Sequence, residues 1–420
     1  MTGSAKNQAR RNFLRAGGAL AGGALASTAS AAGALAGQAQ PLEVAPWSKT
    51  PGEPALWHPY GQPSPFEDKV VRRSRGAAPF PGANSSMTPL QDLFGIITPT
   101  GLVFERHHAG IPLIDPAQHR LAVHGLVARP TLFTMDDLVR LPSVSRIHFL
   151  ECSGNTGREW KGPGTASLQF SHGLLSCCEW TGVPLSVLLD EVGVDPQAAW
   201  ILAEGADAAG MTRSIPITKA LDDALLVYAQ NGERLRPEHG YPLRLFLPGF
   251  EGNMSVKWLR RLKVGREPFM SREETAKYTD SLPDGKARQF TFLMETKSVI
   301  TFPAPDHRLR EQGFYQIAGL AWTGRGRIRR VDVSTDGGHN WQQARLQEPV
   351  LDRALTRFTL PWRWDGAPTV LQSRALDETG YVQPTGRQLV HARGVESNYH
   401  FNAIQSWKVG TDGIISNVQV

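Results

Sequence analysis

The alternation of hydrophobic and polar positions changes along the chain, and it predicts a mixed domain at residues 88–285. Arg120–Gly125 alternates with the period of two that is typical of a strand. Thr134–Leu141 begins with a capping threonine followed by acidic residues, which predicts a helix that Pro142 ends. Further strands are expected at 145–150 and 243–249, and a further helix at 183–192. Because these elements follow no regular strand–helix–strand order, we expect the α+β class and not a doubly wound sheet.

After about residue 290 the pattern becomes one of strands. Phe314–Trp322 has the composition of a strand, Arg327–Ser334 alternates, and Asp336–Gly338 supplies a hairpin turn. Two more strands are expected at Thr356–Leu360 and 369–375. Strands spaced roughly ten residues apart are typical of an immunoglobulin-like β-sandwich, which we expect at residues 286–420.

Residues 40–87 are rich in proline, glycine and serine, and they predict an extended arm with little regular structure. Within this arm, Val70–Arg73 is expected to pair or dock as a short stretch. We find no internal repeat in the chain.

Residues 1–39 have the pattern of an export signal. Four basic residues precede Ala16–Gln38, a stretch without charge that is rich in alanine, glycine and leucine. The pair Arg10-Arg11 resembles a twin-arginine signal, which predicts export to the periplasm in the folded state. A membrane anchor is the alternative, but alanine and glycine partition weakly into hydrocarbon and no second span follows. The cleavage site stays open.

Charge and cysteine content narrow the function. The 420 residues include 45 Lys and Arg against 39 Asp and Glu, a net charge of +6 and a pI near 9.3. Without residues 1–39, which hold four basic and no acidic residues, the net charge falls to +2. Nucleic acid is therefore not an expected partner. Three cysteines are too few for a disulfide framework, a four-cysteine iron–sulfur cluster or a four-cysteine zinc site.

Cys152 is the cysteine most suited to chemistry. It follows a predicted strand and lies in the glycine-containing stretch Glu151–Arg158, where a bulky group can approach the sulfur. Arg158 would favour the thiolate. Cys152 could be a nucleophile, a soft metal ligand or a buried structural cysteine. Cys177 and Cys178 are expected to be ordinary buried thiols, and their redox state stays open.

Basic side chains near two predicted strands suggest a site for an anion. Arg106-His107-His108 follows an apolar run, but no metal-spaced histidine or cysteine completes a zinc site. His239, Arg244 and Lys257 flank the strand expected at 243–249. Together with Arg106, His108 and Arg158, they predict a cradle for a phosphate group.

Several stretches resemble, in order and spacing, the sulfite oxidase family of molybdenum-cofactor enzymes. These are Phe104–His108, Leu150–Asn155, Trp180–Leu185, Glu238–Arg244 and Val256–Leu259. The tail with Arg393–Val395 resembles that family's dimerisation domain. Pro89–Pro99, 208–213 and 403–407 are similar to the molybdenum subunit of sulfane dehydrogenases, which belong to the Sox thiosulfate-oxidising system. The resemblance covers about residues 88–420.

The resemblance implies roles for the candidate residues. Cys152 would be the thiolate ligand of molybdenum. The pterin and phosphate of the molybdenum cofactor would be held by Arg106, His108, Asp207, Ser214, His239, Arg244, Ser255 and Lys257. The substrate would lie against Arg106, Tyr278 and Arg393. Arg158 is the candidate for a second anion-binding arginine, although Thr156-Gly157 separates it from the matching motif.

The resemblance also implies the reaction and the partners. Sulfane sulfur, carried as a persulfide on a cysteine of a small carrier protein, would be oxidised. Two electrons would pass to a dihaem c-type cytochrome subunit. The chain contains no Cys-x-x-Cys-His motif, so we expect no haem in it. A homodimer and a heterotetramer with the cytochrome are both open.

Four other functions are considered. A dehydrogenase of free sulfite with the same cofactor is the nearest alternative. A reductase, for example of methionine sulfoxide, is less favoured because such relatives usually lack the sandwich domain. A cysteine hydrolase would need a general base, and no histidine stands beside Cys152 in the sequence. A binding protein without catalysis would carry neither molybdenum nor pterin.

Overall fold

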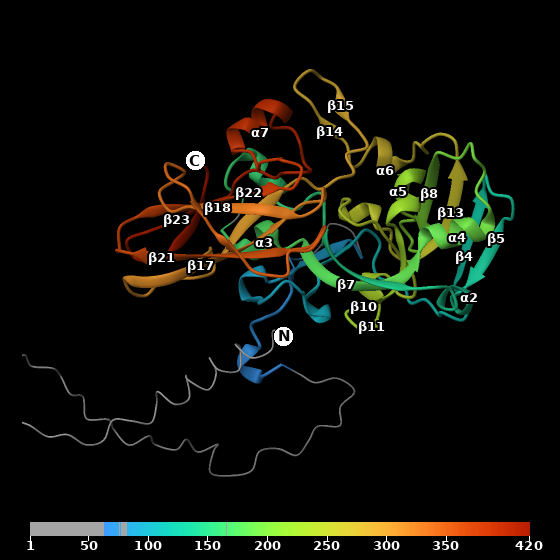
Figure 1. Ribbon diagram of the computed structural model, residues 1–420, viewed down its shortest axis with the longest axis horizontal. Helices are drawn as coiled ribbons and strands as arrows, with labels where there is room; N and C mark the ends of the chain where they lie inside the picture. The colour runs from blue at the N-terminus through green and yellow to red at the C-terminus, as the bar shows by residue number, and fades with distance from the viewer. Residues whose placement is uncertain (1–62, 75, 77–81, 165) are drawn as a thin grey trace, which may run out of the picture. The chain divides into compact units, whose positions relative to one another are not determined.

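The structure is a computed structural model that describes residues 63–74, 76, 82–164 and 166–420 (Figure 1). The expected export signal and residues 40–62 of the expected arm lie outside the described residues. Ser64–Val420 form one compact unit. No helix in the described part of the chain is long and apolar enough to cross a membrane.

The N-terminal half of this unit holds a small sheet and two five-stranded sheets. The small sheet has the order β1-β2-β3 and consists of β1 (Arg73–Ser74), β2 (Asn84–Met87) and β3 (Glu105–His107). The next has the order β11-β10-β7-β6, with β12 also paired to β10, and consists of β6 (Val144–Glu151), β7 (Leu175–Pro184), β10 (Leu225–Gln230), β11 (Glu233–Arg234) and β12 (Arg244–Phe246).

The other five-stranded sheet has the order β5-β4-β13-β8-β9. It consists of β4 (Arg120–Gly125), β5 (Thr131–Thr134), β8 (Trp200–Gly205), β9 (Thr212–Pro216) and β13 (Leu259–Gly265). Its strands are antiparallel except for β13, which runs parallel to β4.

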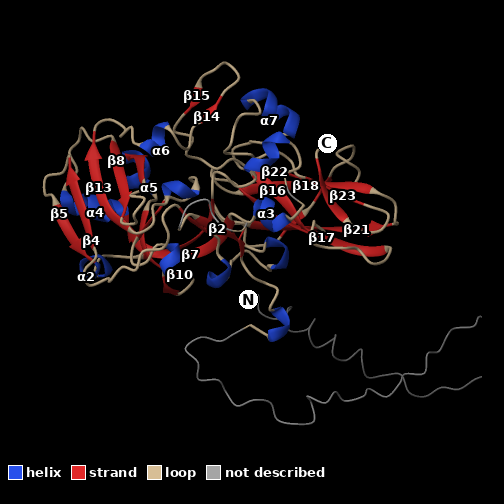
Figure 2. Ribbon diagram, turned by 180° about the vertical axis from the view of Figure 1, so that it is seen from behind, coloured by secondary structure: helices blue, strands red, loops and turns tan. Residues whose placement is uncertain are grey.

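Short helices and turns connect these strands, and they lie beside the sheets in Figure 2. The α-helices are α2 (Met135–Val139), α3 (Leu168–His172), α4 (Leu185–Val192), α5 (Ile217–Asp222), α6 (Arg272–Thr275) and α7 (Gly386–Arg393). Thr134 and Asp137 form a capping box at the start of α2, which satisfies otherwise unpaired N–H groups there. The helix α4 ends at Gly193, whose φ of 68° suits glycine.

The C-terminal half is a β-sandwich. One sheet has the order β16-β17-β21-β20 and consists of β16 (Lys297–Phe302), β17 (Gly313–Trp322), β20 (Arg345–Leu346) and β21 (Thr356–Trp364). The other has the order β19-β18-β22-β23-β24 and consists of β18 (Ile328–Ser334), β19 (Gln342–Gln343), β22 (Thr369–Asp377), β23 (Ser406–Val409) and β24 (Ile415–Val418). A hairpin of β14 (Asp280–Ser281) and β15 (Ala287–Arg288) precedes them.

The two halves share part of their hydrophobic core. The sandwich core contains Trp322, Phe358 and Trp407, and it continues through Phe149 on β6 and Leu175 on β7. A second core fills the space between the sheets and helices of the N-terminal half. Because the sandwich core includes β6, the sandwich lies directly against the strand that leads to Cys152.

The α+β class and the C-terminal β-sandwich are confirmed. The expected strand at 120–125 coincides with β4, and the one at 145–150 lies within β6. The helix expected at 183–192 begins only at Leu185, because Val183 and Pro184 pair with β10 as the end of β7. The capping and turn signals are local, whereas the extent of β7 depends on its neighbours.

Candidate functional site

One pocket collects most of the candidate residues. It lies between β3, the loop after β6 and the segments on either side of β12. The candidate residues that line it are Arg106, His108, Cys152, Asp207, His239, Arg244, Ser255, Lys257 and Tyr278. Residues far apart in the sequence therefore meet at one place, as the anion-cradle interpretation requires.

Cys152 lies at the end of β6, in a loop held by backbone hydrogen bonds. Its N–H donates to the carbonyl of Leu174 at 3.0 Å, and its carbonyl accepts from Asn155 at 2.8 Å. Cys152 is half-buried and lines the pocket, and burial raises the pKa of its thiol. A side chain at Gly252 would lie 2.9 Å from the carbonyl of Glu151, so glycine permits the close approach of this segment. The thiol thus needs a cation or a metal to become a thiolate.

Lys257 and Arg244 bring positive charge into the pocket wall without a carboxylate hydrogen-bond partner. Among the described residues, the ammonium of Lys257 donates to the carbonyls of Arg106 and Glu238 and to His107 Nδ1. The guanidinium of Arg244 donates to the carbonyls of His239 and Ser255 at 3.0 and 3.2 Å. These partners carry no net charge, so neither cation makes a direct ion pair, although the carboxylates of Glu105, Asp207 and Glu238 act on Lys257 from a distance.

Two side-chain nitrogens in this wall have no hydrogen-bond partner in the described structure. They are Arg244 Nε and His239 Nδ1, and both are buried. Burial lowers the pKa of Arg244 to about 10 and, with the Arg244 charge beside it, that of His239 to about 3. Burial and the Arg244 charge also lower the pKa of Lys257. A bound anion in the pocket would offset the unfavourable free energy of burying these charged and unpartnered groups.

A further chain of contacts behind Lys257 escaped the sequence analysis. His107 Nδ1 lies 2.7 Å from the Lys257 ammonium, and His107 Nε2 lies 2.6 Å from Glu105. Since Lys257 donates to Nδ1, Nε2 carries the ring proton and donates to the carboxylate, whose pKa falls to about 2. Side chains of a strand alternate between its faces, so the spacing of Glu105 and His107 on β3 could have predicted this pair.

Another part of the pocket is formed around Tyr278. Its hydroxyl lies 3.3 Å from His108 Nε2, and the Arg213 guanidinium lies 4.9 Å from the centre of its ring. Burial and the Arg106 charge lower the pKa of His108 to about 4, so the ring is neutral at pH 7. Burial raises the pKa of Tyr278, and the phenol stays protonated.

Three candidate residues do not line the pocket. Ser214 is buried on β9, and its hydroxyl donates to the carbonyl of Phe269. Arg393 ends α7 and donates to Glu295 at 2.6 Å and to the carbonyl of His400 at 3.0 Å. Arg158 is exposed in the 3-10 helix Gly157–Lys161. Their proposed roles stay predictions.

The residues present fit an anionic cofactor that carries a soft metal. A buried donor and a buried acceptor without partners, next to two buried cations, suit a phosphate and a hydrogen-bonding ring system. Cys152 offers the one thiol among the residues that line the pocket. No group of three or more His, Cys, Asp or Glu in the described residues could hold a metal by protein ligands only.

Two family models match the chain. "Oxidoreductase molybdopterin binding domain" matches residues 108–273, which include Cys152 and most of the pocket. "Mo-co oxidoreductase dimerisation domain" matches residues 288–406, in the sandwich.

Known proteins agree with these matches. Mitochondrial sulfite oxidase from Mus musculus is 32% identical over 80% of this chain and 66% of its own length. Nitrate reductase [NADH] from Ulva prolifera is 33% identical over 64% of this chain and 34% of its own length. The chain thus spans about a third to two thirds of these curated relatives. The crystal structure of the sulfane dehydrogenase SoxCD from Paracoccus pantotrophus matches with 49% identity and a TM-score of 0.88, over 90% of this chain and 98% of that one.

The chain therefore belongs to the sulfite oxidase family of molybdopterin-dependent oxidoreductases, as its motifs indicated. Within this family it is similar to sulfane dehydrogenase SoxCD, which confirms the narrower resemblance found in the sequence.

Proposed function

We propose that this chain is the molybdenum subunit of a sulfane dehydrogenase. In this proposal it oxidises sulfane sulfur that a small carrier protein presents as a cysteine persulfide during thiosulfate oxidation. The observation that carries the proposal is the likeness to SoxCD, at 49% identity over 98% of that chain. The pocket supports it, since it brings one cysteine together with two buried cations that make no direct ion pair among the described residues.

In this proposal Cys152 ligates molybdenum, and the cations of the pocket wall hold the pterin and its phosphate. Arg244 would donate through its unpartnered Nε, and Lys257 would act through its charge. The neutral ring of His239 directs its proton on Nε2 to the carbonyl of Val103, so its unpartnered Nδ1 would accept a hydrogen bond from the pterin. Asp207 and Ser255 also line the wall and would contact the ring system. When bound, the cofactor supplies the two-electron transfer of an oxygen atom to sulfur.

The other residues would act on the substrate. Arg106, which lines the pocket, stabilises the negative charge that develops on the oxidised sulfur group. The neutral ring of His108 contacts the Tyr278 hydroxyl and holds it at the pocket. Arg393 would act from the sandwich side, and Arg158 from the surface.

The electrons must leave through another protein in this proposal, because the sequence has no haem attachment motif. We propose a dihaem c-type cytochrome as the acceptor and a small sulfur carrier protein as the second partner. The matched dimerisation domain supports a homodimer or a heterotetramer with the cytochrome. The twin-arginine pattern at residues 1–39 supports a periplasmic location.

Free sulfite is the second candidate substrate, because curated relatives are named sulfite oxidases. Steady-state assays with cytochrome c as acceptor separate the two. Carrier-bound persulfide should be turned over, and free sulfite slowly or not at all. Brisk oxidation of free sulfite in the absence of the carrier would contradict the proposal.

The cofactor itself is tested by analysis of the exported protein. We expect one molybdenum and one pterin per chain. Cys152→Ser should lower turnover by more than about 100-fold, because even residues that only orient a metal ligand change activity 10–100-fold. Wild-type protein without molybdenum and pterin would leave only a binding function. A Cys152→Ser variant with unchanged turnover would exclude the thiolate role.

A further inference from the structure

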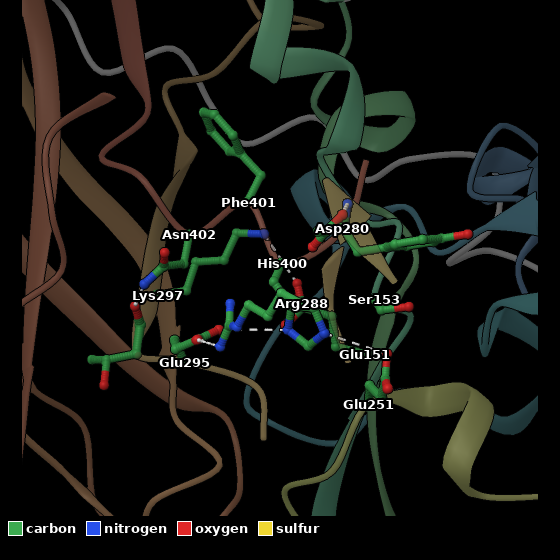
Figure 3. A network of polar contacts seen from close by, with 12 residues as sticks. Glu151, Ser153, Glu251, Asp280, Arg288, Glu295, Lys297, His400, Phe401 and Asn402 are labelled. Atoms are coloured by element: carbon green, nitrogen blue, oxygen red, sulfur yellow. Dashed lines mark hydrogen bonds and ion pairs between the residues drawn. The ribbon is translucent and has the colours of Figure 1, made fainter. Parts of the chain in front are cut away.

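A buried charge cluster joins the sandwich to the loop that carries Cys152. At its centre is His400, whose side chain is fully buried between Glu251 and Glu295 (Figure 3). His400 Nε2 lies 3.3 Å from Glu251, and Nδ1 lies 3.5 Å from Glu295. Neither contact has hydrogen-bond geometry, so both ring nitrogens are held mainly by charge attraction.

The cluster holds the imidazolium form of His400. The two carboxylates outweigh the effect of burial and raise the pKa of His400 to about 9. Each carboxylate also meets arginine. Arg213 lies 3.3 Å from Glu251, and Arg393 and Arg288 lie 2.6 and 3.4 Å from Glu295. Arg213 also pairs with Glu274 at 2.9 Å. Each charge in the cluster therefore faces at least one charge of opposite sign, which burial requires.

The backbone around His400 touches the Cys152 loop directly. The N–H of His400 donates to the carbonyl of Ser153 at 2.9 Å. The Thr156 hydroxyl donates to the carbonyl of Phe401 at 2.9 Å. A side chain at Gly157 would lie 2.4 Å from the carbonyl of Asn398, so the two segments are in close contact. Ser153–Gly157 is thus bound by the segment 398–401 along its length.

A second route runs from the cluster to the same loop. Asn253 donates to Glu251 at 2.8 Å and to the hydroxyl of Ser153 at 3.0 Å. Its side chain therefore ties the carboxylate that faces His400 to the residue after Cys152.

Both segments also adopt strained backbone. The φ of His400 is 56° and that of Thr156 is 60°, in the left-handed region that residues other than glycine seldom occupy. Tyr278 and Trp258, which line the pocket, have φ values of 50° and 53°. Such residues persist where the surroundings over-determine them, and they gather at active sites.

We infer that His400 is a positioning residue for the reaction, which locks the segment 398–401 of the sandwich against Ser153 and thereby fixes the direction of the Cys152 sulfur. The inference rests on the proposed function, in which Cys152 ligates molybdenum. It gives the sandwich a role inside the same chain, beyond that of a dimerisation domain. Residues that orient a metal ligand commonly change activity without touching the substrate.

The test compares two variants of the full-length holoenzyme. His400→Gln removes the charge at the centre of the cluster. His307→Gln is the matched control, since His307 is a partly buried histidine of the sandwich that contacts Ala304 and Phe302 and not the Cys152 loop. Molybdenum content, the thiolate-to-metal charge-transfer absorption, kcat and KM are measured for each. A purely structural role would not move the absorption band.

We expect His400→Gln to shift or weaken the charge-transfer band and to lower kcat by about tenfold, with KM changed less than about twofold. His307→Gln should keep the wild-type band and kcat. Reduced molybdenum loading of His400→Gln with a wild-type band and kcat per molybdenum would show a purely structural role and would overturn the inference. A His400→Gln enzyme with wild-type band and kcat would overturn it, and so would equal changes in both variants.

If His400→Gln does not accumulate, Glu295→Gln carries the test, because it removes one of the two carboxylates that hold His400 and Glu295 does not line the pocket. A shifted band would support the inference, and a wild-type band would overturn it. Wild-type protein without molybdenum would instead overturn the proposed function, which molybdenum analysis identifies before any variant is compared.

Discussion

Two groups of buried charges lie near the Cys152 loop, and they differ in how far the protein itself pairs each charge. In the pocket wall, Arg244 and Lys257 donate only to neutral groups among the described residues, and their pKa values are lowered. In the junction cluster, centred on His400, Glu251 and Glu295, each charge faces an opposite one and the pKa of His400 is raised. The cations of the pocket wall gain a direct charge partner only when an anion binds. In the junction cluster, each charge faces an opposite charge within the protein.

This difference separates ligand binding from architecture. A buried charge without a partner is costly, and a fold retains it where a ligand repays the cost. A compensated cluster contributes to folding only while every member is present, since removing one partner leaves another uncompensated. Substitutions should therefore affect stability in one group and cofactor retention in the other.

The largest effect on stability is expected for Glu251→Gln. Glu251 faces Arg213 and His400, both fully buried, so its neutralisation should lower the free energy of unfolding by about 3–5 kcal/mol. Glu396→Gln is the control, because Glu396 pairs with Lys161 at the surface and should matter by less than about 1 kcal/mol. Denaturant unfolding measures both. Equal changes in the free energy of unfolding for the two variants would show that burial does not strengthen the ion pairs of the cluster.

The pH dependence of the free energy of unfolding tests whether His400 in the junction cluster is an imidazolium. The pKa of His400 is raised from 6.5 to about 9, so its stabilising contribution is complete below pH 6.5 and is lost as pH rises through 9. The stability difference between wild type and His400→Gln should shrink by roughly 3 kcal/mol across this range. A difference that stays constant from pH 6.5 to 9.5 would contradict a buried imidazolium.

In contrast to Glu251→Gln, Lys257→Met should weaken cofactor retention and leave stability almost unchanged. In cofactor-free chains the free energy of unfolding should change by less than about 1 kcal/mol, because the lost hydrogen bonds are offset by relief of an uncompensated charge. Cofactor retention should fall by about tenfold or more. A cofactor-free Lys257→Met chain that is destabilised as strongly as Glu251→Gln would erase the distinction between the two groups.

The sequence predicted the pocket better than the junction, for a physical reason. Cys152, Arg106 and Lys257 lie in short motifs at strand ends, where local pattern and family resemblance both apply. His400 and Glu251 carry no local signal, because a buried charge is recognised only by partners that the tertiary fold brings close. Arg393 was placed at the substrate from its motif, whereas its contacts in the structure are with Glu295 and His400.

The prediction of secondary structure was also limited to features with a local sequence signal. Thr134 marked the start of α2 because a capping box uses side chains three residues apart. The helix start at 183 was wrong by two residues, since pairing of β7 with β10 extends to Pro184. The sequence therefore predicted features that depend on neighbouring residues, such as the capping box. It did not predict features that depend on pairing between distant segments.

The smallest effect is expected for Arg158→Ala. Arg158 is exposed and does not line the pocket, so its removal should change the free energy of unfolding by less than about 0.5 kcal/mol. Arg106→Ala, within the pocket, is the comparison and should lower kcat/KM by about 100-fold, the scale of a lost oxyanion donor. Steady-state kinetics with the persulfide carrier measures both. A rise in KM of tenfold or more for Arg158→Ala would place this arginine on the path of the substrate or its carrier, so surface charge would also serve binding.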